Sequence, residues 1–214
     1  MRTQIKICGV RDTATAEVAA AGADLIGFIM CPRFWRYIPP EAVKSICNAV
    51  PQSKKAGVFV DQPAEFAAAA AAYCGLDFIQ LHGHESPAYA RRLRELLING
   101  TQGRAPQIIK ALRYGEDFSP ELANNYPAEL ILIDSYSQNS EGGSGISFAW
   151  QSAAPAIKKV KKPYLIAGGI SAENLQEAVT VFAPYGIDVS SSLERERQKQ
   201  PDLIRIFLEK AGRL

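Results

Sequence analysis

The sequence predicts an α/β fold, a single (β/α)8 TIM barrel that spans residues 1–214. Two patterns and the length of 214 residues support this prediction: short apolar segments recur along the chain, and a helix-like segment follows each of them. The apolar segments lack the polar alternation of a half-exposed sheet, which is typical of parallel strands covered on both faces. Such a series of β-then-α units fits a closed barrel better than a doubly wound sheet.

Short apolar runs mark the predicted strands. They are Gln4–Cys8, Leu25–Met30, Ala56–Val60, Phe78–Leu81, Ile108–Ala111, Leu130–Ile133, Tyr164–Ala167 and Ile187–Val189. In a barrel of this kind the active site is built at the carboxyl ends of the strands, from the loops that follow them. The residues at those ends are therefore the candidates for chemistry.

Helix-like segments follow the strands. They are Asp12–Ala21, Glu41–Val50, Pro63–Tyr73, Pro87–Leu97, Pro120–Asn125, Phe148–Val160, Ala172–Phe182 and Asp202–Lys210. Asp12 can cap the first helix and Gly22 can end it. An alanine run at 67–72 favours helix strongly, and the helix should stop near Gly75.

Composition and charge favour a protein that acts on small molecules. The chain is 47% hydrophobic and 21% charged, with a net charge of +2 and no basic stripe of the kind that nucleic-acid binders carry. No apolar run approaches the roughly 20 residues of a membrane span, and the first residues are strand-like rather than a signal peptide. We expect a cytoplasmic protein with no nucleic-acid or membrane partner. The cysteines lack CxxC spacing and are expected to be free thiols: Cys8, Cys31, Cys47 and Cys74.

Glycine- and serine-rich loops follow the last three predicted strands. They contain Gly143, Ser144 and Gly145, then Gly168 and Gly169, then Ser190 and Ser191. Backbone amides, hydroxyls and a helix N-terminus can together bind a phosphate, and barrels often do so after their last two strands. One such loop alone would be interpreted as a turn. Because adjacent loops agree, we expect a phosphate site.

Cys8 and Asp134 end the first and sixth predicted strands. Strand alternation puts Lys6 and Cys8 on one side, and this side is the barrel interior if Ile5 and Ile7 face the helices. A cysteine is more often a small buried hydrophobe, but the nearby cation can lower its pKa from roughly 8.5 towards neutrality and make it a base. Asp134 is either a solvated loop residue or, if partly buried, a protonated general acid.

Arg36 and His82 are further candidates. Arg33 and Arg36 lie among aromatic residues in the segment CPRFWRYIPP. A guanidinium suits a carboxylate and the aromatic rings can shelter an aromatic substrate, although loop arginines are usually only solvated. His82 and His84 can hold a metal with a nearby carboxylate, but the chain has no other histidine. We therefore expect no metal and treat His82 as a possible substrate contact.

These segments, in this order, closely resemble the phosphoribosylanthranilate isomerase family. They are KICGV at Lys6, GADLIGFI at Gly22, RYIPPE at Arg36, AGVFV at Ala56, IQLHGHE at Ile79, IKAL at Ile109, LIDSY with GGSG at Leu132, IAGGISAENL at Ile166 and IDVSSSLE at Ile187. The resemblance implies an Amadori rearrangement of N-(5-phosphoribosyl)anthranilate to 1-(2-carboxyphenylamino)-1-deoxyribulose 5-phosphate, the third step of the anthranilate-to-tryptophan route. It also implies no cofactor.

The resemblance implies roles for three residues. Cys8 matches the family's general base, Asp134 its general acid, and Arg36 the arginine that faces the anthranilate carboxylate. Some positions depart from the family pattern and leave the phosphate contacts of their loops open: Ile146, Ala149, Ser192 and the run Gln198-Lys199-Gln200-Pro201-Asp202.

Two rival functions remain at this point. A metal-dependent ribulose-phosphate epimerase would use His82 and His84 as ligands, and a non-catalytic barrel would only sense a phosphorylated metabolite. The presence of both Cys8 and Asp134 argues against a sensor. The expected partner is a small phosphorylated substrate, and the chain is expected to be a monomer or a homodimer.

Overall fold

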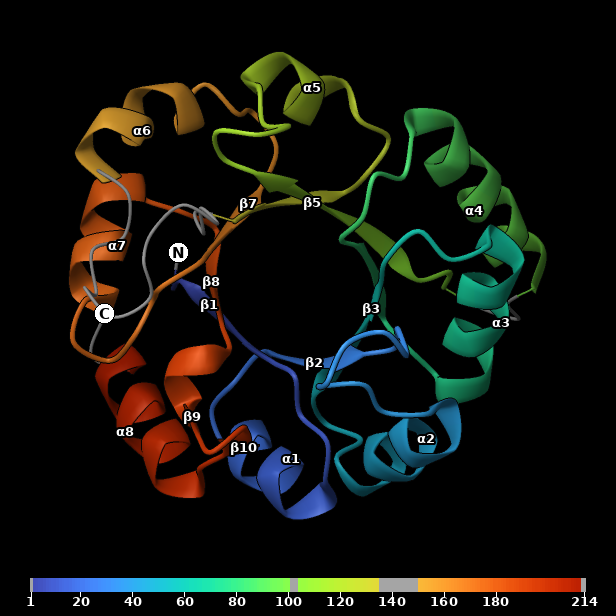
Figure 1. Ribbon diagram of the computed structural model, residues 1–214, viewed down its shortest axis with the longest axis horizontal. Helices are drawn as coiled ribbons and strands as arrows, with labels where there is room; N and C mark the ends of the chain where they lie inside the picture. Colours follow the sequence, from blue (N-terminus) through green and yellow to red (C-terminus); the bar gives the residue numbers. More distant parts are fainter. Residues whose placement is uncertain (1, 101–103, 135–149, 213–214) are drawn as a thin grey trace.

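A computed structural model of the chain describes residues 2–100, 104–134 and 150–212. Its main feature is a closed barrel of parallel strands in the order β1 to β8, ringed by helices on the outside (Figure 1). The strands are β1 (Gln4–Cys8), β2 (Leu25–Ile29), β3 (Lys54–Phe59), β4 (Phe78–Leu81), β5 (Gln107–Arg113), β6 (Leu130–Asp134), β7 (Tyr164–Ala167) and β8 (Gly186–Val189). The predicted fold class and all of the predicted strands are confirmed, with shifts of at most a few residues.

The helices also agree closely with the prediction. They are α1 (Thr13–Ala20), α2 (Pro40–Ala49), α3 (Ala64–Cys74), α4 (Pro87–Gly100), α5 (Pro120–Asn125), α6 (Trp150–Ile157), α7 (Leu175–Phe182) and α8 (Pro201–Ala211). The predicted start of α6 at Phe148 lies outside the described residues. No helix within the described ranges combines the length and the apolar character that a membrane crossing would require.

Helix ends follow local chemistry. The Asp12 carboxylate caps α1 by accepting from the Thr15 N–H at 2.8 Å, as predicted. Gly75 ends α3 in the left-handed conformation, with φ of 68°, also as predicted. The expectation for Gly22 is wrong, because Ala21 occupies the C-cap and has right-handed helical angles.

Helix α7 begins later than the predicted Ala172. The Asn174 side chain explains the delay: it accepts from the Ser171 N–H at 2.8 Å and donates to the Gly169 carbonyl at 2.9 Å. These bonds close a turn over residues 171–174. A helix N-terminus therefore does not directly follow Gly168 and Gly169, contrary to the prediction.

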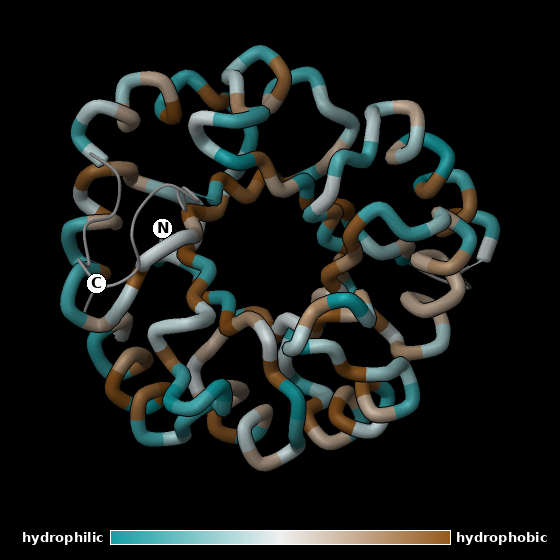
Figure 2. The backbone as a smooth tube through the Cα atoms, in the orientation of Figure 1, coloured by the Kyte–Doolittle hydropathy of each residue, from teal (hydrophilic) through white to brown (hydrophobic). Residues whose placement is uncertain are grey.

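Two apolar layers lie on either side of the barrel wall. The inner layer is Leu25, Ala56, Phe78, Ile109, Ala111, Leu130, Leu132, Leu165 and Ala167. The outer layer, between strands and helices, includes Ile5 and Ile7. Figure 2 shows hydrophobic residues concentrated along the ring of strands, with hydrophilic residues prominent on the helices and loops outside it. Because Ile5 and Ile7 face outward, Lys6 and Cys8 face inward, as predicted.

A two-stranded hairpin between β8 and α8 was not predicted. It consists of β9 (Glu194–Arg195) and β10 (Gln198–Lys199), after a short 3-10 turn at Ser191–Leu193. The residues of its tight turn, Glu196 and Arg197, have positive φ angles of 50° and 61°. Tight hairpin turns usually contain Asn-Gly or Asp-Gly in the sequence, and this turn contains neither.

Candidate active site

A pocket of about 490 Å³ opens at the carboxyl ends of the strands. Its lining includes the candidates that lie within the described residues: Cys8, Arg36, His82, Asp134, Gly168, Gly169, Ser190 and Ser191. The candidates Gly143, Ser144 and Gly145 lie outside those residues, as do Ile146 and Ala149. Segments far apart in the sequence therefore meet at one cavity of a size usual for small-molecule sites.

Cys8 lies at the end of β1 and is only 5% exposed. Burial raises the pKa of its thiol above the ordinary value, and the negative charge of Asp188 adds to this effect. The positive charge of Lys6 acts in the opposite direction but does not prevail. The expectation of a pKa near neutrality is therefore wrong, because desolvation of the thiolate outweighs the neighbouring cation.

The Lys6 ammonium does not act on the Cys8 thiol alone, because it is also paired with Asp188. The ammonium lies 2.8 Å from the Asp188 carboxylate, and Lys6 is 1% exposed. Burial by itself would lower the pKa of Lys6, but the charges of Asp188 and Cys8 raise it, so the lysine stays cationic. Sequence reasoning missed Asp188, although a charged residue inside an apolar strand was a usable signal. Lys6 and Asp188 are paired in the β1–β8 register.

Asp134 ends β6, and 22% of its side chain is exposed. Its Oδ2 lies 3.6 Å from Nε2 of His82, and Nδ1 of His82 lies 2.8 Å from Nε2 of Gln80. If the Gln80 amide donates to Nδ1, the imidazole carries its proton on Nε2, which faces Asp134. Gln80 was also missed by sequence reasoning. Its Oε1 is buried and has no hydrogen-bond partner among the described residues, while Gln80 as a residue contributes to the pocket lining.

Arg36 approaches the pocket from the β2–α2 loop. Its Nε and Nη2 donate to the two carboxylate oxygens of Glu194 at 2.8 and 2.7 Å. Its guanidinium carbon lies 4.1 Å from the centre of the Trp35 ring. Glu194 also accepts from Lys199 at 2.7 Å. Sequence reasoning expected an arginine facing a substrate carboxylate and did not foresee an internal carboxylate beside it.

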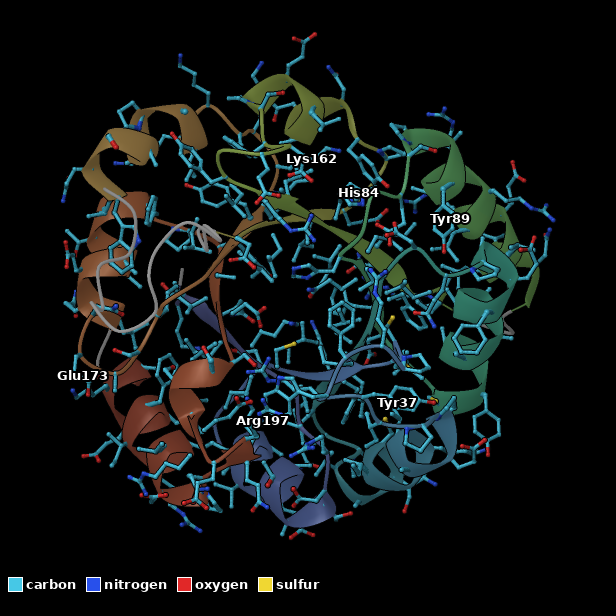
Figure 3. The ribbon with its side chains drawn as sticks, in the orientation of Figure 1. Tyr37, His84, Tyr89, Lys162, Glu173 and Arg197 are labelled. Atoms are coloured by element: carbon cyan, nitrogen blue, oxygen red, sulfur yellow. The ribbon has the colours of Figure 1, made fainter. Side chains whose placement is uncertain are left out.

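His84 does not join His82. Its Nδ1 lies 3.6 Å from the carboxylate of Asp61, and its side chain is 80% exposed. Hydrogen bonds and charge from His84 lower the pKa of Asp61, although burial acts in the opposite direction. His84 and Arg197 lie on opposite sides of the barrel opening (Figure 3). Within the described ranges, no group of three or more histidine, cysteine or acidic residues lies close enough to hold a metal ion.

The loops after β7 and β8 are tied to each other and to Cys8. Gly168 and Gly169 have positive φ angles of 90° and 65°, which glycine adopts without strain. The Ser192 hydroxyl donates to the Ile170 carbonyl at 2.6 Å, so this departure from the family pattern bridges the two loops. The Ser190 hydroxyl donates to the Cys8 carbonyl at 3.0 Å. A small anionic group can therefore meet glycine backbone and serine residues beside the thiol.

The chain is similar to known proteins over nearly its whole length. Residues 5–210 match the family described as N-(5'phosphoribosyl)anthranilate (PRA) isomerase. The N-(5'-phosphoribosyl)anthranilate isomerase of Desulforamulus reducens is 38% identical over 209 residues, covering 97% of this chain and 94% of the relative. The crystal structure of the Thermotoga maritima phosphoribosyl anthranilate isomerase is 31% identical, with a TM-score of 0.84 over 99% of this chain and 100% of that one. A phosphoribosyl anthranilate isomerase in complex with reduced 1-(o-carboxyphenylamino)-1-deoxyribulose 5-phosphate is 29% identical, with a TM-score of 0.81 over 99% and 100% of the two chains. The chain belongs to the N-(5'-phosphoribosyl)anthranilate isomerase family.

Proposed function

We propose that this isomerase of tryptophan biosynthesis works with Cys8 as general base, Asp134 as general acid and Arg36 as the group that binds the substrate carboxylate. The observation that carries the proposal is that Cys8 on β1 and Asp134 on β6 line one pocket together with Arg36. The reaction relocates protons along one sugar, so it needs an acid and a base at different atoms of the substrate. Separate strands supply the two groups.

The first step opens the ribose ring. Asp134 donates its proton to the ring oxygen, and the C1–O bond breaks as the anthranilate nitrogen forms a double bond to C1. The product is an open-chain Schiff base. The closeness of His82 Nε2 to Asp134 Oδ2, 3.6 Å, supports this role, because an imidazole N–H can stabilise the carboxylate that remains.

The second step moves a proton away from C2. The Cys8 thiolate takes that proton, and the electron pair shifts towards the Schiff base to give an enolamine. Tautomerisation then adds a proton at C1 and removes the one on the C2 hydroxyl, which leaves the ketone. Lys6 supports this step because its ammonium is buried beside the thiol and opposes the raised pKa of Cys8.

The two ends of the substrate hold the sugar between these groups. The phosphate is assigned to Gly168, Gly169, Ser190 and Ser191, with the predicted loop of Gly143, Ser144 and Gly145 as a further contributor. Their positions on the β7 and β8 loops of the pocket support the assignment. The anthranilate carboxylate is assigned to Arg36. Anchoring both ends brings the reacting carbon into reach of the acid and the base.

The direct test follows the fluorescence of freshly prepared phosphoribosylanthranilate, with and without chelator. Wild type, Cys8→Ala and Asp134→Ala are compared. We expect an enzyme-dependent decay in the wild type that chelator does not change and that both variants lose. Decay at the spontaneous rate in the wild type would overturn the proposed activity, and activity in Cys8→Ala or Asp134→Ala would overturn that residue's role.

A further inference from the structure

Arg36 is held by the protein on several sides. Gly9, which directly follows Cys8, has a φ of +80°, and a Cβ placed there would lie 2.9 Å from Cδ of Arg36. The arginine stem therefore crosses the backbone next to the catalytic thiol at close range. The guanidinium carbon of Arg36 lies 4.1 Å from the centre of the Trp35 ring. Both carboxylate oxygens of Glu194 accept hydrogen bonds from one edge of the guanidinium. The side chain is fixed before any substrate carboxylate arrives.

Glu194 is itself held in place. Its side chain is 8% exposed, and Lys199, whose side chain is 3% exposed, donates to Oε1 at 2.7 Å. Burial alone would raise the pKa of Glu194, but hydrogen bonds from Arg36 and Lys199 lower it. The carboxylate therefore remains ionised at neutral pH. A buried, doubly paired carboxylate is a rigid anchor rather than a loosely solvated partner.

The geometry of the pair leaves one edge of the guanidinium for a ligand. Glu194 engages Nε and Nη2, while the hydrogens on Nη1 point away from that edge. We propose that Glu194 is a positioning residue that orients Arg36, so that its Nη1 side selects substrates whose aromatic ring carries a carboxylate. This inference rests on the proposed role of Arg36. It adds that Glu194 holds the Arg36 side chain in the orientation which that role requires.

The anchor also connects to the catalytic thiol. Lys199 donates to the carbonyl of Ser190 at 2.9 Å and to its hydroxyl at 3.2 Å, and that hydroxyl donates to the Cys8 carbonyl at 3.0 Å. A continuous hydrogen-bonded frame therefore runs from Arg36 through Glu194 to the backbone of Cys8. Such a frame fixes the separation between the carboxylate site and the base, and small errors in this separation are costly in catalysis.

The test measures selectivity for the carboxylate. Two ligands are titrated by calorimetry: 1-(2-carboxyphenylamino)-1-deoxyribitol 5-phosphate and its phenylamino analogue, which lacks the carboxylate. We expect wild type to prefer the first, and Glu194→Gln to lose about tenfold or more of that preference because a charge-assisted bidentate pair is broken. Binding of the analogue should change little. In steady-state kinetics, KM for phosphoribosylanthranilate should rise more than kcat falls.

A double-mutant comparison separates positioning from general loosening. If Glu194 acts through Arg36, then adding Glu194→Gln to Arg36→Ala should cost no further selectivity. Arg195→Gln is the matched control, because it breaks the exposed Arg195–Asp202 pair of the same hairpin and should leave both ligand affinities unchanged. Glu194→Asp retains the charge but is shorter, and it should recover part of the selectivity.

Three results would overturn the inference. Equal weakening of both ligands in Glu194→Gln would indicate a merely structural residue, and unchanged selectivity would show that Arg36 needs no anchor. Additive losses in the double mutant would mean that Glu194 acts on its own. Failure of the proposed function is distinguishable, since in that case the wild type itself would bind both ligands equally well.

Discussion

Two buried lysine–carboxylate pairs lie on opposite faces of the barrel wall. Lys6 and Asp188 face the interior and are 2.8 Å apart, whereas Lys110 and Glu85 are 2.9 Å apart. Lys110 lies between two inward-facing residues of β5 and therefore points outward, towards the helices. Burial and distance are nearly the same for both pairs, so these properties alone do not tell which pair takes part in chemistry.

The pairs differ in how their hydrogen bonds are used. Glu85 also accepts from the backbone N–H groups of Asp61 and Gly83, at 2.9 and 3.0 Å, and Lys110 donates to the Gly83 carbonyl at 2.6 Å. Asp188 holds Lys6 and also lines the pocket, next to Cys8. A buried network whose groups all bind one another fixes the chain. A pair with one member on a pocket can act on a ligand or on a neighbouring thiol.

The largest expected effect is on the inward side. Cys8→Ala should lower kcat by about 10²–10⁴-fold, the usual contribution of a general base, while the unfolding free energy changes little. Urea unfolding and single-turnover kinetics measure the two quantities. Cys74→Ala is the matched control, because Cys74 is also a buried thiol but lies on α3, away from the pocket. Near wild-type turnover in Cys8→Ala would remove this residue from the mechanism.

The outward pair should show the reverse. Glu85→Gln should lower the unfolding free energy by about 3–5 kcal/mol, because it leaves the Lys110 charge buried and unpaired. The turnover of the protein that remains folded should stay within about threefold of wild type. Glu95→Gln, on the exposed face of α4, is the control and should change stability by less than about 0.5 kcal/mol. A strong loss of kcat without loss of stability would break the proposed division between the two pairs.

A smaller effect is expected from Asp188→Asn, and it should appear in the pH profile. Because the pKa of Cys8 is raised, the wild-type kcat/KM should increase with pH through the alkaline range as the thiolate forms. The negative charge of Asp188 is one cause of the raised pKa of Cys8. Asp188→Asn removes this charge and leaves Lys6 facing the thiolate, so the alkaline limb of the pH profile should move to lower pH. Glu85→Gln should not move the limb. A limb that stays in place in Asp188→Asn would show that Asp188 does not act on Cys8.

The barrel was predictable because its signals are local. Each strand is an apolar run, and caps such as Asp12 and Gly75 mark helix ends through their own side chain or backbone. The β9–β10 hairpin was not predicted because Glu196 and Arg197 adopt positive φ angles, which glutamate and arginine rarely do. Its tertiary contacts hold it in place, including the bond from Lys199 to the Ser190 carbonyl.

Of the site residues, the sequence could predict only those that lie at the ends of strands or in the loops that follow them. Cys8 and Asp134 each end an apolar strand, and the barrel geometry brings such ends together. The bonds around the other pocket residues could not be read from the strand ends: Asp188 of β8 pairs with Lys6, Glu194 of the hairpin binds Arg36, and Gln80 of β4 contacts His82. Neither the bidentate bond to Arg36 nor the raised pKa of Cys8 can be inferred from spacing. Both depend on which atoms meet in the fold and on how much water reaches them.

The smallest effect concerns Glu194, which shares features of both pairs: it is closely paired, like Glu85, and it lies beside the pocket arginine. Its pKa is lowered from 4.5, so the stability that its charge provides is present above that value and is lost as the pH falls through the lowered pKa. Stability of Glu194→Gln should therefore fall less steeply than that of wild type between about pH 5 and pH 3, as measured by urea unfolding. Glu129→Gln should flatten the same slope, because the pKa of Glu129 is also lowered, against the effect of burial, by Arg94 and the Ile108 N–H. Only Glu194→Gln should also raise KM. If both variants raise KM, or neither does, Glu194 belongs with Glu85 as a structural carboxylate, and the orientation of Arg36 needs another cause.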